Sequence, residues 1–245
     1  MDDFKLAIEL AKKEEAKLTI GVQQEKILHR TIKYYLEKDE QYHEIKVGKM
    51  FADIKKDNLI YEIQTANFNS LRHKLDIFLP NYQVKVVYPI AYNKTIHLID
   101  SSGEITIRKS PKKGSSFLLF IELYKIKSYL KDPNLSFKIL LIDIDEYRTK
   151  TEKKHYHSKG FQKEVQIPID LIKEYDINNT SDIYQLFNDY PKLFNNFTSK
   201  DFSKIIKVSP NKANTILNVL YYLDIVERID KNKNAYIYQI KKENI

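Results

Sequence analysis

The chain has 245 residues, of which 42% are hydrophobic and 12% aromatic, so it can bury one large core or two modest ones. It contains no cysteine, which excludes disulfides, thiolate catalysis and cysteine-ligated zinc. A net charge of +8 favours a polyanionic partner, and a charged, helical start with no long uncharged run predicts a cytoplasmic protein without membrane association.

Residue patterns along the first half of the chain predict an α/β fold. Helices are expected over 3–17, 21–37 and 67–79, and strands over 42–47, 50–54, 59–65, 82–88, 95–99 and 105–108. The strand 82–88 is β-branched and aromatic, and it is expected to end at Pro89. The order α, β, β, β, α, β predicts a mixed sheet with helices on its faces.

Two acids and a carboxamide fall together in the strand pair 50–54 and 59–65. Side chains alternate along a strand, so Glu62 and Gln64 share a face, and a tight hairpin brings Asp53 beside them. Glu62 interrupts the apolar run LIYEIQT, where a charge is costly without a cation or a donor. The pair could hold a divalent cation at a phosphate, or it could be two solvated carboxylates at a strand edge.

Asp53, the segment Glu62-Ile63-Gln64 on the next strand, an amphipathic helix and a further strand resemble the core of the PD-(D/E)XK nuclease superfamily. The resemblance covers roughly the segment from the second helix to the strand 95–99. It implies a restriction-endonuclease-like mixed sheet with helices on both faces. It also implies that Asp53, Glu62 and the backbone carbonyl of Ile63 bind Mg²⁺ or Mn²⁺.

One position departs from that superfamily. Where a lysine is usual the chain has Gln64, as some members do, and a carboxamide can orient the attacking water but cannot bring a positive charge to the transition state. Lys85 on the following strand, which we include in the expected catalytic set, and Lys74 on the following helix are the candidate replacements. The superfamily also often carries a glutamate on the first helix or strand, for which Glu25 and Glu44 are candidates.

The segment RKSPKKGSS concentrates cations around a turn set by Pro111 and Gly114. A compact basic loop beside a phosphate-cleaving site could grip a nucleic-acid backbone, whereas a solvated loop is the commoner meaning of a charge run. The cations are Arg108, Lys109, Lys112 and Lys113. The combination of EIQT, RKSPKKG and the C-terminal pattern described below is also similar to an uncharacterised bacterial protein family.

The middle of the chain predicts a buried helix over 115–130 and an apolar strand over 136–145. A basic stretch, 147–163, follows and is expected to be a connector. It contains His155 and His157, which share a strand face but have no further ligands near them in the sequence. A short strand and helices are expected over 165–189.

The C-terminal segment 191–245 divides into helix, turn, helix and hairpin, and it resembles a winged helix-turn-helix domain. Thr198 or Ser199 caps the first helix, and Ser209 and Pro210 open the second. The resemblance implies that the second helix enters the DNA major groove while the hairpin loop DKNKN touches phosphates. A protein-interaction or dimerisation role is the alternative. The expected DNA-contacting residues are Asn211, Lys212, Asn214, Thr215, Asn218, Lys231 and Lys233.

These observations predict a nuclease-like domain over 1–165, a connecting helical segment over 166–190 and a winged helix-turn-helix domain over 191–245. The expected function is Mg²⁺- or Mn²⁺-dependent hydrolysis of DNA phosphodiester bonds. The alternative is a non-catalytic DNA-binding protein whose nuclease-like domain has lost activity and serves for dimerisation, which Gln64 favours. DNA is the expected partner, a homodimer is left open, and an RNA substrate is not excluded by charge.

Overall fold

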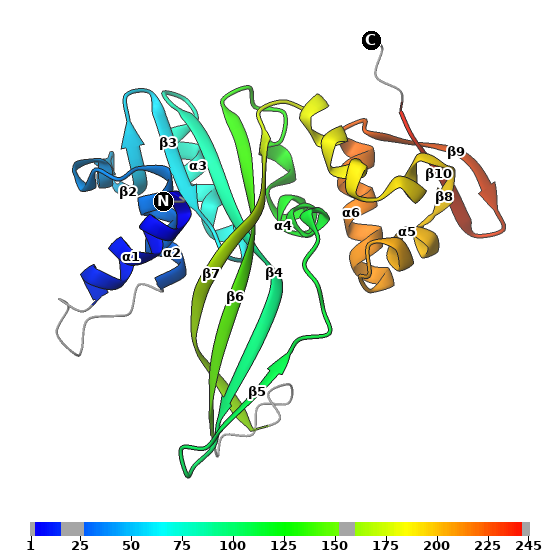
Figure 1. Ribbon diagram of the computed structural model, residues 1–245. Coiled ribbons are helices and arrows are strands. Elements are labelled where there is room, and N and C mark those ends of the chain that lie inside the picture. Colours follow the sequence, from blue (N-terminus) through cyan, green and yellow to red (C-terminus); the bar gives the residue numbers. More distant parts are fainter. Residues whose placement is uncertain (1–2, 16–26, 152–159, 242–245) are drawn as a thin grey trace.

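A computed structural model describes residues 3–15, 27–151 and 160–241 of the protein (Figure 1). The chain is an α/β protein built on a large mixed sheet, with a second, three-stranded sheet close to its C-terminal end. The helices are α1 Asp3–Glu15, α2 Ile27–Leu36, α3 Arg72–Phe78, α4 Leu119–Leu123, α5 Ser199–Ile205 and α6 Pro210–Tyr222. The strands are β1 His43–Val47, β2 Met50–Lys56, β3 Leu59–Ile63, β4 Gln83–Ile99, β5 Ile105–Lys109, β6 Leu135–Lys150, β7 Phe161–Ile177, β8 Phe197–Thr198, β9 Val226–Asn232 and β10 Ala235–Ile240.

The large sheet has the strand order β1-β2-β3-β4-β6-β7, and β5 adds to the far end of β4. β3, β4 and β6 are parallel, whereas β1 with β2, β2 with β3, β4 with β5 and β6 with β7 are antiparallel. The predicted mixed sheet is therefore confirmed.

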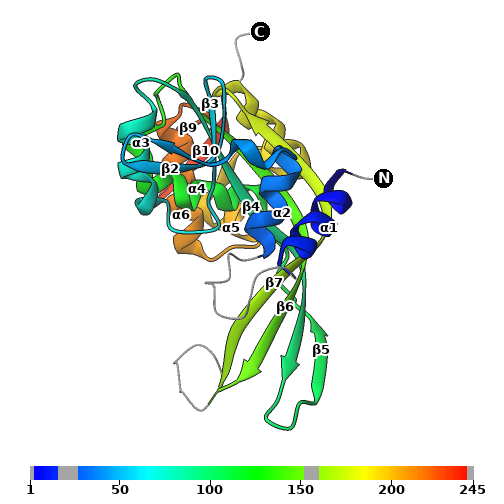
Figure 2. The same ribbon diagram turned by 90° about the vertical axis from the view of Figure 1, so that its left-hand side faces the viewer.

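Helices cover both faces of this sheet because its central strands are apolar on both sides. On one face α1 and α2 pack through Phe4 and Ile32 against Val87 and Leu140. On the other face α3 and α4 pack through Leu75 and Phe120 against the opposite side of the same strands. The helices therefore approach the β2–β3 hairpin from its two sides (Figure 2).

The strands β4, β6 and β7 are longer than expected, and their far halves leave the helices behind to form, with β5, a projecting arm (Figures 1 and 2). We call residues 92–109, 144–151 and 160–168 the arm. The expectation that the strand ends at Pro89 was wrong, because β4 continues through this residue to Ile99. Gln64 N donates to Val87 O, so the backbone polar groups of Val87 face β3. Those of Pro89, two residues later, face the same side, but β3 has ended at Ile63 and offers no partner at that level. The missing proline N–H therefore breaks no ladder bond.

Two further expectations differ from the structure. The segment expected as one helix over 115–130 is α4 flanked by the 3₁₀ helices Ser116–Leu118 and Tyr124–Tyr129, with non-helical backbone at Ile126. The segment 166–190 is helical only from Ser181, because β7 carries the large sheet to Ile177, beyond the expected domain boundary at 165.

The C-terminal residues form α5, α6 and the sheet β8-β10-β9. Thr198 and Asp201 cap α5 reciprocally, and Ser209 caps α6 with Pro210 in its first turn, as the sequence indicates. This part shares its core with α4 and with the 3₁₀ helix Ser116–Leu118 before it, where Phe117 lies 5.4 Å from Phe202 between ring centres. Within the described residues, no helix is both long enough and apolar enough to span a membrane.

Candidate functional site

Asp53 and Glu62 lie together where the β2–β3 hairpin opens. The last paired residues of this hairpin are Ile54 and Tyr61, and beyond them the two strands separate. The Asp53 carboxylate accepts the Ile63 N–H at 2.6 Å, so it lies in the gap between the strands. The Glu62 carboxylate reaches back to the Asp53 N–H at 3.4 Å. The structure therefore brings the two predicted acids to one place, and both are buried.

Two basic side chains approach this acid pair from opposite faces of the sheet. His29 of α2 places Nε2 3.3 Å from the Asp53 carboxylate. Lys74 of α3 places Nζ 2.7 Å from the Glu62 carboxylate, whose side chain is only 2% exposed. Each acid thus has a basic partner carried by a helix that is packed on the sheet.

Burial and mutual repulsion set the protonation of the pair. Burial, and then the charge of Asp53, raise the pKa of Glu62 to about 7 although Lys74 opposes the shift. Burial also acts to raise the pKa of Asp53, but the hydrogen bond and charge of His29, the charge of Lys74 and the Ile63 N–H together hold it below its usual value. Glu62 is therefore the member of the pair that takes up a proton first.

The donor set fits a hard divalent cation in part. Two adjacent buried carboxylates can supply oxygen ligands to Mg²⁺ or Mn²⁺. The Ile63 carbonyl points to the same side of β3 as its N–H, which is the Asp53 side. No group of three or more His, Asp or Glu side chains that could hold a metal ion occurs in the described part of the chain. The remaining ligands would therefore be water or a phosphate.

Two other residues considered for the site, Lys85 and Glu44, have partners elsewhere. Lys85 faces away from Glu62 and donates to Asp176 and Asn178 at 2.9 Å each, because it alternates with Val86, which is paired with Glu62 in the sheet. Lys74, the second candidate, is the lysine that reaches the site. Glu44 pairs with Lys33 at 2.6 Å.

Gln64 lies just after β3 and is turned toward the loop that follows. Its amide donates to Ala66 O and to Ser70 Oγ, both at 2.8 Å. In this conformation the carboxamide supports the loop. Glu25, His155 and His157 lie outside the described residues.

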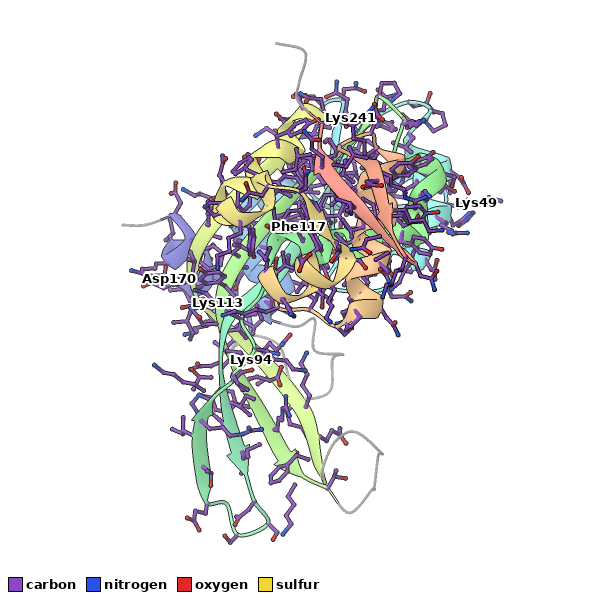
Figure 3. The ribbon with its side chains drawn as sticks, turned by 90° about the vertical axis from the view of Figure 1, so that its right-hand side faces the viewer. Lys49, Lys94, Lys113, Phe117, Asp170 and Lys241 are labelled. Atoms are coloured by element: carbon purple, nitrogen blue, oxygen red, sulfur yellow. The ribbon has the colours of Figure 1, made fainter. Side chains whose placement is uncertain are left out.

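A groove of about 450 Å³ lies at the base of the arm. We call it the neck groove. It begins at Leu28 and Thr65, which adjoin His29 and Gln64 in the sequence, and it continues along the basic side chains Lys94, Lys112, Lys113, Arg148 and Lys163. Figure 3 shows Lys94 and Lys113 where the arm leaves the body.

Glu146 organises part of this groove. Its side chain, 2% exposed, bonds Lys94 at 2.8 Å and also pairs with Arg148. Burial opposes its charge, but these two cations lower the pKa of Glu146 to about 2. Glu146 therefore stays charged and fixes both cations at the groove wall.

The basic loop is held against β4 by Gly114. Gly114 N donates to Tyr92 O at 2.8 Å, and a Cβ at this position would lie 2.3 Å from Ala91 O. Only glycine permits this approach. Lys113 then lies with Nζ 4.0 Å above the Tyr92 ring. Lys112 and Lys113 line the neck groove, whereas Arg108 and Lys109 lie on the exposed strand β5 of the arm.

The comparisons with known proteins place most of this architecture in one family. Residues 26–178, more than half of the chain, match the family model described as Domain of unknown function (DUF8091). The chain belongs to this family. The DUF8091 match contains the large sheet with Asp53, Glu62 and Lys74, and it ends one residue after β7.

A relative of the DUF8091 protein occurs in Treponema pallidum (strain Nichols), where it is described as an uncharacterized protein. The two are 34% identical over 127 residues, which are 51% of each chain, so this chain spans about half the length of that relative. No solved structure matches the chain significantly.

The predicted DNA-contacting residues lie beyond the DUF8091 match, on α6 and on the β9–β10 hairpin. Asn211, Lys212 and Asn214 are exposed on the first turns of α6, and the Thr215 hydroxyl donates to Asn211 O at 3.1 Å. Asn218, farther along α6, is also exposed and accepts a hydrogen bond from Lys127 at 2.9 Å. Lys231 and Lys233 are exposed on the β9–β10 hairpin.

Sequence reasoning missed the charged network of the neck groove in the DUF8091 domain. Glu146 lies where an apolar strand was expected to have ended, so its burial carried no signal, although its position two residues before Arg148 was visible. The contact of His29 with Asp53 has no signal in the sequence, because it depends on how α2 packs on the sheet.

Proposed function

We propose that this protein is a metal-dependent nuclease that hydrolyses phosphodiester bonds in DNA. The observation that carries the proposal is the buried pair of Asp53 and Glu62 at the open end of one hairpin. Buried like charges are costly, and a structure retains them where a cation or a reaction needs them.

The arrangement of elements supports the same assignment. The order α2, β1, β2, β3, α3, β4, with β4 parallel to β3, is the order that the resemblance to PD-(D/E)XK nucleases implies. Under this proposal Asp53, Glu62 and the Ile63 carbonyl would hold Mg²⁺ or Mn²⁺. A divalent cation held there supplies Lewis acidity toward a phosphate and an activated water.

The side chains around the acids take the remaining roles. Lys74, at 2.7 Å from Glu62, is the cation that we assign to the charge developing on the phosphate, in place of Lys85. His29 holds the Asp53 carboxylate in position. Gln64 could orient water only after leaving its contacts with Ala66 O and Ser70 Oγ.

The surface near the acids supports a nucleic acid as substrate. Five lysine and arginine side chains line the neck groove, and these cations can bind a phosphate backbone. The helices α5 and α6 with the β9–β10 hairpin have the element order of a winged helix, and the exposed start of α6 would meet DNA.

The test is cleavage of duplex, single-stranded and branched DNA, and of RNA, with Mg²⁺ or Mn²⁺. Asp53→Asn and Glu62→Gln are each expected to abolish cleavage, and Lys74→Gln to reduce it by at least a hundredfold. Lys85→Gln is the matched control, because it removes the same charge from a lysine on the opposite face, and it should cleave like the wild type. Cleavage that survives both acid substitutions, or that depends equally on Lys85 and Lys74, would refute the assignment.

A second candidate function is a non-catalytic DNA-binding protein that keeps the fold and has lost the reaction. The engagement of Gln64 with the loop, together with the shortage of acidic ligands in the described residues, favours this alternative. It predicts DNA binding that persists in Asp53→Asn, and no cleavage by the wild type with any of the metals.

A further inference from the structure

The strand β5 forms one edge of the arm. Among the described residues it pairs with β4 alone, and all five of its residues are exposed. Ile105 and Ile107 expose 52% and 62% of their surface. Soluble proteins usually protect such an edge, because unpaired backbone groups beside aliphatic side chains bind another strand.

Hydrogen bonds at the two ends of the β4–β5 hairpin show which backbone groups of β5 point outward. Asp100 N donates to Glu104 O at 3.1 Å, and Ser110 N donates to Lys94 O at 2.8 Å. Backbone groups alternate in direction along an antiparallel strand. Glu104, Thr106 and Arg108 therefore direct their N–H and C=O groups to β4, whereas Ile105 and Ile107 direct theirs away from it.

We propose that β5 pairs antiparallel with β5 of a second copy of this chain, about a two-fold axis at Thr106. In this register Ile105 lies opposite Ile107 of the partner subunit, and the outward backbone groups of these two residues bond each other. The aliphatic side chains of both copies then form one patch. On the other face of the strand Glu104 lies opposite Arg108 of the partner subunit, and the symmetry repeats this ion pair.

The register follows from the order of the side chains. Displacing the pairing by two residues keeps the outward groups in phase, but it places Ile105 opposite Lys109 or opposite itself and separates Glu104 from Arg108 in either direction. Of these registers, only the one centred on Thr106 pairs Ile105 with Ile107 and Glu104 with Arg108, with Thr106 opposite itself on the axis.

The paired strands would join two arms into one continuous sheet. Ile107 is paired with His97 in β4, and His97 stacks on Tyr147 of β6 with 4.4 Å between ring centres. The patch of isoleucines is therefore followed, on the same face of the arm, by the stacked rings of His97 and Tyr147. Five paired residues per copy bury less than the roughly 1,200–2,000 Å² of a standard stable interface, so the dimer forms reversibly with concentration.

Sedimentation over a wide range of concentration tests the proposal. The wild type is expected to form a dimer, and Glu104→Arg and Arg108→Glu are each expected to raise its dissociation constant about tenfold, because the axis repeats each like-charge contact. The double variant carrying both changes should recover the wild-type constant. A wild type that stays monomeric overturns the proposal, and so does a dimer that the single changes do not affect.

A cysteine cross-link tests the register. The chain has no cysteine, so Thr106→Cys introduces a single thiol on the axis, where facing Cα atoms of a non-hydrogen-bonded pair lie about 4.5 Å apart, within disulfide range. Mild oxidation with oxidised glutathione should link this variant rapidly. Lys109→Cys is the matched control on the same strand and should link slowly, because its two copies lie far apart. Equal rates would contradict the proposed pairing. Neither experiment depends on nuclease activity.

Discussion

Burial raises the pKa of Glu62 to about 7, and Lys74, 2.7 Å away, opposes this shift by favouring the charged carboxylate. Replacing Lys74 with Met removes this ion pair, so Glu62 must take up a proton or stay charged without a partner, and the free energy of unfolding should fall by about 1–3 kcal/mol at neutral pH. Lys56→Met is the control, because Lys56 makes an ion pair of the same length with Glu37 but is 50% exposed, and it should cost clearly less than Lys74→Met. Urea titration measures both, and equal losses would contradict the role of Lys74.

Glu146 gives a second prediction, in acid. Its pKa of about 2 lies below the ordinary value of 4.5, so its ion pairs with Lys94 and Arg148 stabilise the fold fully above pH 4.5 and are lost as the pH falls toward 2. Glu146→Gln should lower stability at neutral pH by about 2 kcal/mol and flatten the dependence between these pH values. Urea midpoints measured across this pH range check it, and an unchanged slope would show that Glu146 is not ion-paired.

At the scale of single residues, the sequence alone predicts that Asp53 and Glu62 lie together, but it does not decide which lysine reaches them. Alternation along the strand and the short turn place Asp53 and Glu62 side by side, because both are local rules. The choice between Lys74 and Lys85 depends on which face each occupies. Val86 is paired with Glu62, so Lys85, the residue before it, points to the opposite face of the sheet. The parallel register of β3 and β4 decides this, and it cannot be derived from local sequence.

The predicted DNA-contacting side chains of α6 differ in their contacts with the rest of the protein. Its first turns expose Asn211 and Lys212, whereas Asn218 is bonded to Lys127 of the body. Lys212→Ala should therefore weaken DNA binding several-fold and reduce the slope of log affinity against log salt by about one, while Asn218→Ala should leave both unchanged. Fluorescence anisotropy over a salt series checks this, and equal effects of the two changes would contradict the exposed-end assignment.

The strands and helices show where element prediction succeeds. Capping residues such as Thr198 and Ser209 identify the starts of α5 and α6 because they act within one turn. Pro89 misled the expectation for β4, because its cost depends on whether a neighbouring strand is present at that level, and β3 ends first. The arm is a consequence of this continuation.

The whole molecule combines an acid pair, a basic groove and a C-terminal module around linked cores. The predicted boundary at 165 falls inside β7. The polar sequence of this segment resembles a connector, and its pairing with β6 is a long-range contact. The C-terminal module shares one hydrophobic core with α4 and with Phe117 of the preceding 3₁₀ helix, so it packs directly on the large-sheet domain. DNA held on α6 and in the neck groove would thus be presented to the acid pair in one orientation.

The most direct measurement is a calorimetric titration of the protein with Mn²⁺, without DNA. The account predicts saturable binding that is lost in Asp53→Asn and in Glu62→Gln and retained in Lys85→Gln. Binding that is absent in the wild type, or that is the same in all four proteins, would contradict the claim that Asp53 and Glu62 share a divalent cation.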